Sequence, residues 1–281
     1  MTPDHTAPTA VPEPRTPGPR RPLAPEVPAP SALFSLADRV ALVTGASGGL
    51  GARFAQVLAA AGASVVVTAR RGDRLAEVAR RCGQGSLAVA GDLTRAADRE
   101  RLIEAALGRY GRIDVLVNNA GTASVEPAER QSVRDFAAIV ELNLTSVFAL
   151  CQLAGQHMLD RGGGSIVNIA SIYGLAASGS LPQAAYAASK GGLVNLTREL
   201  AAQWARRGVR VNAVCPGWYW SELTSQMLET EAGHGWVERR TPMGRPGAPD
   251  ELDGVLLFLA GRASTYVTGA IIPVDGGYLA I

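Results

Sequence analysis

A tyrosine and a lysine four residues apart are the first side chains in this chain that could carry out chemistry. Lys190 is the only lysine among 27 lysines and arginines, and it follows Tyr186 in Tyr-Ala-Ala-Ser-Lys. On a helix, residues four apart lie on one face about one turn apart. A free phenol titrates near about 10, and a neighbouring ammonium lowers that pKa. The pair could therefore act as a general acid for a carbonyl, or as a general base for an alcohol.

A serine at the end of an expected strand could join this pair. The apolar run 165–170 predicts a strand, and Ser171 follows it directly. A hydroxyl at the carboxyl end of a central strand can hydrogen-bond a substrate oxygen. A serine in such a place is also common as a turn or helix-capping residue, so Ser171 alone does not define a site.

Strand-like and helix-like segments alternate from about residue 35 onward. The expected strands are 40–44, 64–68, 86–90, 113–118, 165–170, 209–214 and 270–274. The expected helices are 50–61, 73–81 (with Asp73 as its N-cap), 95–109, 133–159, 185–207 and 249–260. Near-continuous apolar strands alternating with helices predict a parallel sheet covered on both faces. We therefore expect an α/β fold with one doubly wound, seven-stranded sheet, whose ligands bind beyond the carboxyl ends of the strands.

A glycine-rich turn joins the first expected strand to the first helix. It reads Thr-Gly-Ala-Ser-Gly-Gly-Leu-Gly over residues 44–51, and Ser47 and Leu50 lie between its glycines. Gly45, Gly49 and Gly51 let the backbone turn tightly and approach a pyrophosphate, whose charge is met by the helix N-terminus. Glycine clusters are common in tight turns, but the position between a strand and a helix favours a dinucleotide site.

The end of the second expected strand indicates which dinucleotide binds. A carboxylate there would accept hydrogen bonds from the 2′-hydroxyl of the adenosine ribose and repel a 2′-phosphate. This chain has Arg70 and Arg71 instead, and arginine pairs well with phosphate. We therefore expect NADP(H) to be preferred, with NAD(H) as the alternative if both arginines are ordinary solvated charges.

Composition argues against several other classes of protein. The net charge of +2 is small and the arginines are scattered along the sequence, so neither indicates a nucleic-acid-binding surface. The three cysteines form no Cys-x-x-Cys pair, which indicates no metal site and no disulfide framework, and a reducing cytoplasm is the simplest setting. No uninterrupted apolar run is long enough to span a bilayer.

The amino-terminal segment differs from the rest of the chain. Residues 1–30 contain 10 of the 17 prolines and almost no large apolar residues. Such a segment cannot bury enough surface to offset the entropy lost on ordering. We expect a disordered, proline-rich tail over residues 1–34, followed by a single domain over residues 35–281.

The order of the motifs resembles that of the short-chain dehydrogenases/reductases. The matching segments are Thr44–Gly51, Asn118–Gly121, Asn143, Ser171, Tyr186-x-x-x-Lys190 and Pro216-Gly217, so the resemblance covers about residues 35–281. It implies a Rossmann fold and hydride transfer between NADP(H) and a carbonyl or secondary alcohol.

The resemblance also implies a catalytic Asn-Ser-Tyr-Lys tetrad. Ser171 would position the substrate, and Tyr186 would transfer the proton. Lys190 would lower the pKa of Tyr186 and bind the nicotinamide ribose, and Asn143 would hold a water that links Lys190 to solvent. Tyr186 and Lys190 would thus both contact the cofactor. Further cofactor contacts implied by the family are Asp92, Leu93, Asn119, Ala120, Gly121, Pro216, Gly217 and Ser221.

The cofactor and substrate sides differ in detail from the family pattern. NADP-specific relatives often carry arginine where this chain has Gly48, so the expected preference depends on Arg70 and Arg71. A substrate lid is expected at about 217–248. Its aromatic segment 218–220 could wall an apolar or sugar substrate, or pack the lid onto the body. The C-terminal third is similar to gluconate 5-dehydrogenase-like members, and it fits 3-oxoacyl reductase-like members as well.

Three other interpretations of the sequence compete with this one. An epimerase or dehydratase of the same fold would usually be longer, with differently spaced glycines. A non-catalytic NADP(H)-binding sensor would keep the fold and lose the tetrad, and a scaffold would act through the proline-rich tail. Family members are commonly tetramers, so we expect a cytoplasmic homo-oligomer, dimeric or tetrameric. Its partner would be a small carbonyl or alcohol, and neither nucleic acid nor a membrane.

Overall fold

The computed structural model describes residues 27–179 and 181–281. The strands are β1 (Val40–Thr44), β2 (Ser64–Ala69), β3 (Leu87–Ala90), β4 (Val115–Asn118), β5 (Gly164–Ile169), β6 (Val209–Pro216) and β7 (Ile271–Val274). The α-helices are α1 (Pro30–Phe34), α2 (Gly49–Ala60), α3 (Gly72–Arg81), α4 (Ala96–Tyr110), α5 (Val133–Val140), α6 (Ser146–Asp160), α7 (Ala184–Trp204), α8 (Ser225–Leu228), α9 (Glu231–Arg240) and α10 (Asp253–Ala260). The shorter helices are η1 (Glu141–Thr145), η2 (Ile172–Gly174), η3 (Ala205–Arg207), η4 (Pro249–Leu252), η5 (Arg262–Ser264) and η6 (Tyr278–Ala280).

The seven strands form one sheet in the order β3-β2-β1-β4-β5-β6-β7, and every neighbouring pair is parallel. The sheet reverses its direction of growth between β1 and β4, as in a doubly wound fold. All five residues of β1 and all four of β4 are buried, because helices cover both faces of the central strands. The expected doubly wound, seven-stranded α/β sheet is confirmed.

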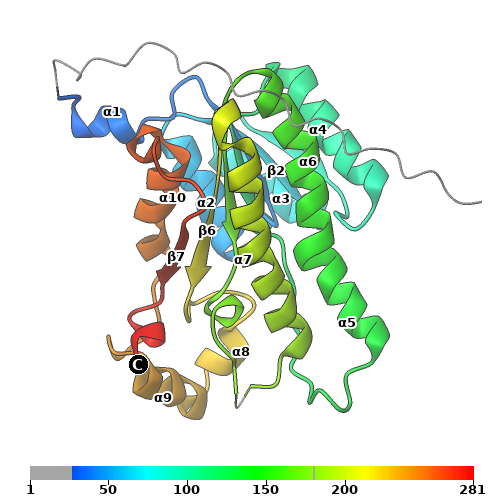
Figure 1. Ribbon diagram of the computed structural model, residues 1–281, viewed down its shortest axis with the longest axis vertical. Coiled ribbons are helices and arrows are strands. Elements are labelled where there is room, and N and C mark those ends of the chain that lie inside the picture. Colours follow the sequence, from blue (N-terminus) through cyan, green and yellow to red (C-terminus); the bar gives the residue numbers. More distant parts are fainter. Residues whose placement is uncertain (1–26, 180) are drawn as a thin grey trace, which may run out of the picture.

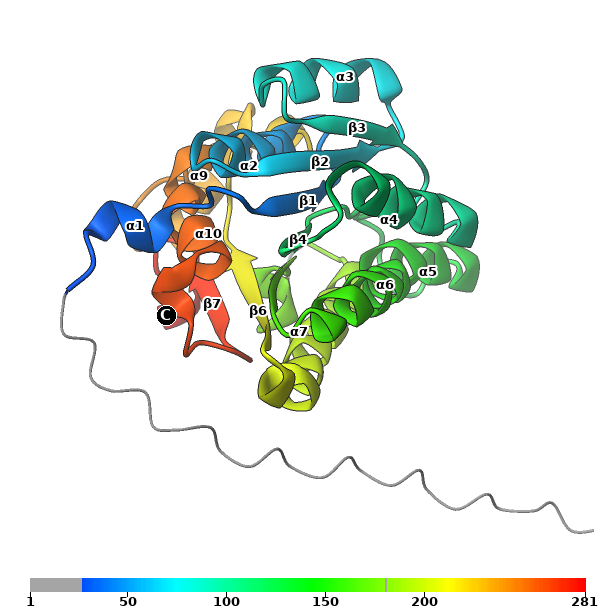
Figure 2. The ribbon, with the colours of Figure 1, turned by 90° about the horizontal axis from the view of Figure 1, so that it is seen from above.

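Side-chain alternation along the strands divides the core into two layers. Leu42 and Val66 pack with α4, α6 and α7 on one face of the sheet. Ala41, Val43 and Val65 pack with α2, α3 and α10 on the other. Figure 2 shows the sheet between α2 and α10 on one side and α4, α6 and α7 on the other. Two apolar layers of this kind hold the strand ends rigidly, and the strand ends position the site.

Several expected helices begin or break at other residues than predicted. The single helix expected over 133–159 is interrupted by η1, a π-helical turn that contains Asn143. The helix expected to begin at Pro249 opens with a 3₁₀ turn. Asp73 lies in the first turn of α3 and does not cap it, because α3 begins at Gly72 with Arg71 at its N-cap. Such turns at helix ends follow local hydrogen bonding, which apolar periodicity does not report.

The first described residues extend the ordered part beyond the expected boundary. Residues 1–26, where most of the expected disordered tail falls, lie outside the described residues. Pro30–Phe34 forms the short helix α1, which contacts α10 and η5. A β-carbon on Gly261 would lie 2.8 Å from the Leu33 carbonyl oxygen, so the two backbones approach closely. Ordered structure therefore begins before residue 35.

The longest apolar helical run is also part of the core. Val133–Asp160 is long and apolar enough to cross a membrane by length and composition, and an 18-residue window within it has a mean hydropathy of 1.6. Its buried residues Leu150, Cys151 and Ala154 belong to the same cluster as residues of the sheet. The run is thus built into the domain as one of the helices that cover the sheet.

The carboxyl ends of the strands converge on one end of the molecule. Figure 1 shows α8, α9 and the C-terminus at the end toward which β6 points. The glycine-rich turn after β1, Ser171 after β5 and Gly217 after β6 all follow strands at this edge. Parallel strands bring these turns together although the glycine-rich turn lies more than a hundred residues before the other two in the chain.

Candidate active site

Lys190 and Tyr186 both belong to α7, and Lys190 contacts the end of β5. The Lys190 Nζ atom lies 5.7 Å from the centroid of the Tyr186 ring. It donates a hydrogen bond of 2.8 Å to the carbonyl oxygen of Ile169, the last residue of β5. Ser171 follows two residues later, and its hydroxyl is close enough to the Tyr186 phenol to act on the pKa of that group. Helix and strand together therefore assemble the three expected side chains.

Burial dominates the electrostatics of this cluster. Desolvation raises the pKa of Tyr186 above its ordinary value, and the hydrogen bond with Ser171 acts in the opposite direction. Desolvation lowers the pKa of Lys190 to about 8. Among the protein's own groups, burial outweighs the effect of Ser171 on the Tyr186 pKa, and the expected lowering by Lys190 stays a prediction. The phenol is held protonated, as a general acid requires.

Asn143 is fully buried in the π-helical turn η1. Its side-chain oxygen accepts from the Thr122 amide at 2.9 Å, and its nitrogen donates to the Thr122 carbonyl at 2.9 Å and to the Ser189 hydroxyl at 3.0 Å. A β-carbon on Gly121 would lie 3.3 Å from Asn143 Oδ1 and 3.6 Å from Lys190 Nζ. Asn143 therefore fixes the segment after β4 beside Lys190, while its role in a water relay stays a prediction.

The arrangement can transfer a proton to or from a substrate oxygen. Tyr186 could donate the proton in the reductive direction and accept it in the oxidative one, and Ser171 could hold the same oxygen. A bound nicotinamide supplies or accepts the hydride, while the protein supplies orientation and electrostatics. Lys190 places a positive charge beside the phenol, which stabilises the phenolate that forms when the proton leaves.

The glycine-rich turn has the backbone geometry that a dinucleotide needs. Gly45 has a φ of 65°, and Gly49 has a φ of 53°. A β-carbon on Gly51 would lie 2.4 Å from the Gly45 carbonyl oxygen, so this close approach of turn and helix needs glycine. A β-carbon on Gly49 would reach the lid at 3.9 Å from Ser221 Cβ, so the turn faces lid residues. A pyrophosphate fits this turn at the N-terminus of α2.

The segment after β4 is fastened to the same turn. Thr44 Oγ1 accepts from the backbone amides of Asn119 and Ala120, each at 3.0 Å. The Asn119 side chain donates to the Thr44 carbonyl at 3.0 Å and to the Gly45 carbonyl at 3.3 Å. The Asn119 amide is thus used to join the two turns. Any contact of this segment with the cofactor would come from its backbone.

The adenosine end of the predicted site contains Arg71 and a further arginine. Arg71 donates through Nε and Nη2 to the Ser47 hydroxyl at 3.2 and 3.0 Å, so it reaches back to the glycine-rich turn. Arg70 is exposed, and its charge helps to lower the pKa of Asp92. Arg74 was not predicted, but it joins Arg71 in pairing with Glu222 of the lid.

The remaining predicted residues lie at the same edge of the sheet. Asp92 caps its own turn, accepting from the Thr94 amide at 3.0 Å and from its hydroxyl at 2.8 Å, and Leu93 is buried in the core. Pro216 ends β6, and a β-carbon on Gly217 would lie 2.7 Å from Asp275 Cα. Ser221 shares a hydrogen bond of 3.0 Å with the Thr224 hydroxyl. These residues lie beyond the carboxyl ends of the strands, and their contacts with the cofactor stay predictions.

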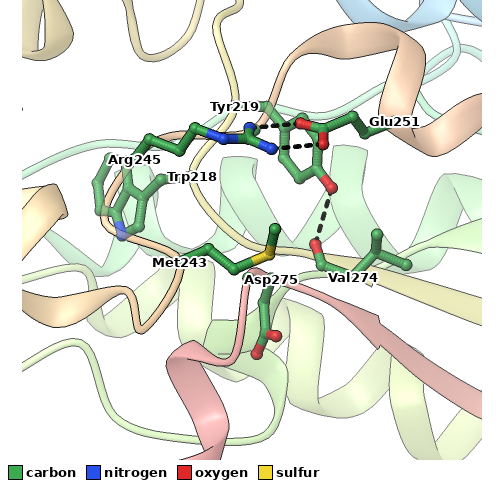
Figure 3. Close-up of a pocket in the computed structure, with 9 residues that line it drawn as sticks. Trp218, Tyr219, Met243, Arg245, Glu251, Val274 and Asp275 are labelled. Carbon is green, nitrogen blue, oxygen red and sulfur yellow. Dashed lines mark hydrogen bonds and ion pairs between the residues drawn. The ribbon is translucent and has the colours of Figure 1, made fainter.

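The aromatic segment of the lid has divided roles. Tyr219 is buried, and its hydroxyl donates to the Val274 carbonyl at 3.0 Å, which packs the lid onto β7 (Figure 3). Trp220 is 39% exposed and stands edge-on to His234. Trp218 instead stands edge-on to Tyr173, which lies two residues after Ser171. Of the three aromatic residues, Trp218 is thus the one directed toward the catalytic cluster.

A cavity of about 190 Å³ lies beneath the lid, next to Trp218. Met243, Arg245 and Asp275 contribute to its lining. Arg245 pairs with Glu251 at 2.7 Å and holds the pKa of that carboxyl at about 2 (Figure 3). None of the tetrad residues lines this cavity, so we assign it to the support of the lid and not to the reaction.

The fold and site together define a nicotinamide-dependent oxidoreductase. A family model described as enoyl-(acyl carrier protein) reductase matches residues 45–279. The chain belongs to the short-chain dehydrogenase/reductase family. The expected membership, Rossmann fold and enzyme class are therefore confirmed.

Several relatives cover nearly the whole domain. Gluconate 5-dehydrogenase of Gluconobacter oxydans is 39% identical over 249 residues, which is 87% of this chain and 96% of the relative. 2-Dehydro-3-deoxy-D-gluconate 5-dehydrogenase of Escherichia coli is also 39% identical, over 88% of this chain and 98% of the relative. The solved gluconate 5-dehydrogenase of Burkholderia cenocepacia, in complex with NADP and tartrate, has a TM-score of 0.85 at 37% identity, covering 89% of this chain and 99% of that chain.

Proposed function

We propose that this protein is an NADP(H)-dependent dehydrogenase that oxidises a secondary hydroxyl of a hydroxy acid, or reduces the matching keto acid. Tyr186 exchanges the proton, Ser171 holds the reacting oxygen and Lys190 supplies the neighbouring charge. The preference for NADP(H) is supported by Arg71, which is directed toward Ser47 in the glycine-rich turn. It is also supported by the similar structure solved with NADP.

A row of aromatic contacts that ends in an arginine carries the substrate part of the proposal. Tyr173 begins the row next to Ser171, Trp218 follows, and the Trp236 ring lies 5.5 Å from Trp218. The Arg240 guanidinium lies 4.5 Å from the centroid of the Trp236 ring. Within residues 27–179 and 181–281, Arg240 forms no ion pair. An aromatic wall ending in an available cation suits a carbon chain with a carboxylate at its far end.

The relatives agree with this choice of substrate. One similar structure is described as a complex with NADP and tartrate, and tartrate is a hydroxy acid. Other relatives are named for gluconate and for cis-4-hydroxycyclohexanecarboxylate, which both carry a carboxylate and a hydroxyl. Two other relatives are named for D-threitol and galactitol, which are uncharged polyols.

The test is a substrate panel followed by nicotinamide absorbance. Purified protein is assayed with NADP⁺ and NAD⁺ against gluconate, tartrate and cyclic hydroxy acids, and against threitol and galactitol. We expect the highest kcat/KM with NADP⁺ and a hydroxy acid. A clear preference for neutral polyols would overturn the substrate assignment. Binding of NADPH without turnover of any substrate would instead favour a non-catalytic NADP(H)-binding sensor.

Arg240→Gln separates carboxylate recognition from catalysis. Losing one charge-assisted hydrogen bond should raise KM for hydroxy acids about tenfold or more, with little change for polyols. Arg239→Gln is the matched control, because Arg239 precedes Arg240 in the same last turn of α9. Equal effects of the two substitutions would remove Arg240 from substrate binding.

A homo-oligomer in the cytoplasm is part of the same proposal. Val133, Phe136 and Phe148 are exposed on α5 and α6, which supports an apolar contact between copies. Light scattering coupled to gel filtration would report the assembly. Phe148→Ser should shift it toward smaller species if this face is the interface, whereas a monomeric wild-type protein would contradict the expectation.

A further inference from the structure

Glu222 belongs to the lid but lies against the predicted phosphate-binding residues. Its Oε2 accepts a hydrogen bond of 2.8 Å from Arg71 Nη2, and its Oε1 accepts one of 2.9 Å from Arg74 Nη1. Arg71 precedes α3 and Arg74 lies in its first turn, whereas Glu222 follows β6. One carboxylate therefore joins the lid to the adenosine end of the site.

The donors that hold Glu222 are those that a phosphate would need. Arg71 Nη2 also donates to the Ser47 hydroxyl at 3.0 Å, so the same nitrogen serves both the glycine-rich turn and the lid. Carboxylate and phosphate oxygens take arginine N–H donors in the same way. A 2′-phosphate that binds Arg71 through this nitrogen must therefore displace Glu222 or Ser47, and one that binds elsewhere on Arg71 still competes with Glu222 for the same positive charge.

Gly48 makes room for this carboxylate. A β-carbon at position 48 would lie 2.6 Å from Glu222 Oε1 and 3.5 Å from Arg71 Nη2. Any larger side chain would exclude Glu222 from this place. NADP-specific relatives often carry arginine at this position. In this chain Gly48 instead leaves the space that the Glu222 carboxylate occupies.

We propose that Glu222 is an internal anion that competes with the 2′-phosphate of NADP(H) for Arg71 and Arg74, so that phosphate binding releases the lid. The inference rests on the proposed preference for NADP(H). Binding and release are linked because the phosphate and the Glu222 carboxylate are both anions that pair with the same two guanidinium groups. The Arg71, Arg74 and Glu222 side chains are 44%, 55% and 54% exposed, so water screens both ion pairs and the competition is moderate.

Glu222→Gln tests the competition without requiring turnover. Binding of adenosine 2′,5′-bisphosphate and of adenosine 5′-monophosphate is measured by calorimetry, because these ligands differ only in the 2′-phosphate. We expect the variant to bind the bisphosphate about two- to fivefold more tightly than wild type, with no change for the monophosphate. Glu229→Gln is the matched control, since Glu229 is an exposed lid glutamate that makes no ion pair with any described residue.

The outcomes separate this inference from the proposed function. Equal binding of the two ligands by wild type would refute the NADP(H) preference itself. A wild type that prefers the bisphosphate, with Glu222→Gln unchanged or equally improved for both ligands, would refute only the role of Glu222. In the double variant Arg71→Ala/Glu222→Gln, the gain from removing Glu222 should be reduced, because the main shared donor is gone.

Tryptophan fluorescence provides an independent reading of lid release. Trp218, Trp220 and Trp236 lie in or beside the lid, and the fourth tryptophan, Trp204, ends α7. We expect the bisphosphate to change the emission of wild type, and Glu222→Gln to show most of that change before ligand is added. Identical emission of the two ligand-free proteins would contradict a lid held by Glu222.

Discussion

The Nζ atom of Lys190 lies 5.7 Å from the centroid of the Tyr186 ring, held there by a hydrogen bond of 2.8 Å to the end of β5. Lys190 is buried between α7 and the sheet, and Tyr186 is half-buried. The compact ammonium fits between helix and strand, where a planar guanidinium would need more room and more acceptors. This relationship explains why the one lysine of the chain stands at this position.

Lys190→Arg should abolish most of the activity while leaving the charge unchanged. A misplaced cation no longer stabilises the phenolate, and we expect kcat to fall by about 100-fold or more. Steady-state kinetics of the variant would be compared with Tyr186→Phe, which removes the proton donor outright. Retention of more than a tenth of wild-type kcat by Lys190→Arg would contradict the assigned role.

The buried lysine should also make stability depend on pH. Its folded pKa of about 8 lies below its ordinary value of 10.5, so between these values the unfolded chain binds more protons. The contribution of Lys190 to the free energy of unfolding therefore rises with pH across this window, by up to about 3 kcal/mol. Below pH 8 the folded protein bears the whole desolvation cost of the charged Lys190 side chain.

Lys190→Met isolates that contribution from the other titrating groups. Burial raises the pKa of Cys82 and Cys215 to about 11 and that of Cys151 to about 12, from 9.0, so the cysteines lower stability above pH 9 in both proteins. Urea unfolding at pH 7 and pH 10 should show the variant losing the lysine-dependent increment. Parallel pH profiles of the two proteins would argue against a lowered Lys190 pKa.

Asn143→Ala should destabilise the protein and reduce its activity together. The substitution leaves the amide and carbonyl of half-buried Thr122 without their side-chain partner, at a cost of about 2–4 kcal/mol. Chemical denaturation would give the loss. Gln131→Ala is a matched amide control, because Gln131 makes one hydrogen bond of 3.0 Å to Ser124 in a more open loop and should cost about 1 kcal/mol or less.

Arg71→Ala should change cofactor choice more than Arg70→Ala. Arg71 is directed to Ser47, whereas Arg70 has no ion pair among the described residues. We expect KM for NADPH to rise about tenfold in Arg71→Ala, with KM for NADH nearly constant. Arg80→Ala serves as the control, since Arg80 pairs with Glu77 near the other end of α3. An equal loss for both cofactors would place Arg71 away from the 2′-phosphate.

Sequence patterns were sufficient to predict the strands of the sheet, because strand formation depends on local residues. Runs such as 64–68 are apolar and β-branched, and the helices between them leave right-handed parallel crossovers as the available connection. The i to i+4 spacing likewise placed Tyr186 and Lys190 on one helical face. These features are short-range, so each can be derived from a few neighbouring residues.

Other features depend on how distant segments dock. The π-helical turn at Asn143 forms where the Asn143 side-chain amide hydrogen-bonds Thr122 and Ser189. The apolar periodicity of the sequence does not predict this turn. The separate roles of Trp218 and Tyr219 are decided by their neighbours Tyr173 and Val274. The Glu222–Arg71 pair joins residues 151 positions apart. The sequence by itself determined the fold and the placing of Tyr186 and Lys190 on one helical face, whereas only the tertiary structure decided which polar side chains face each other, because loop docking has no sequence period.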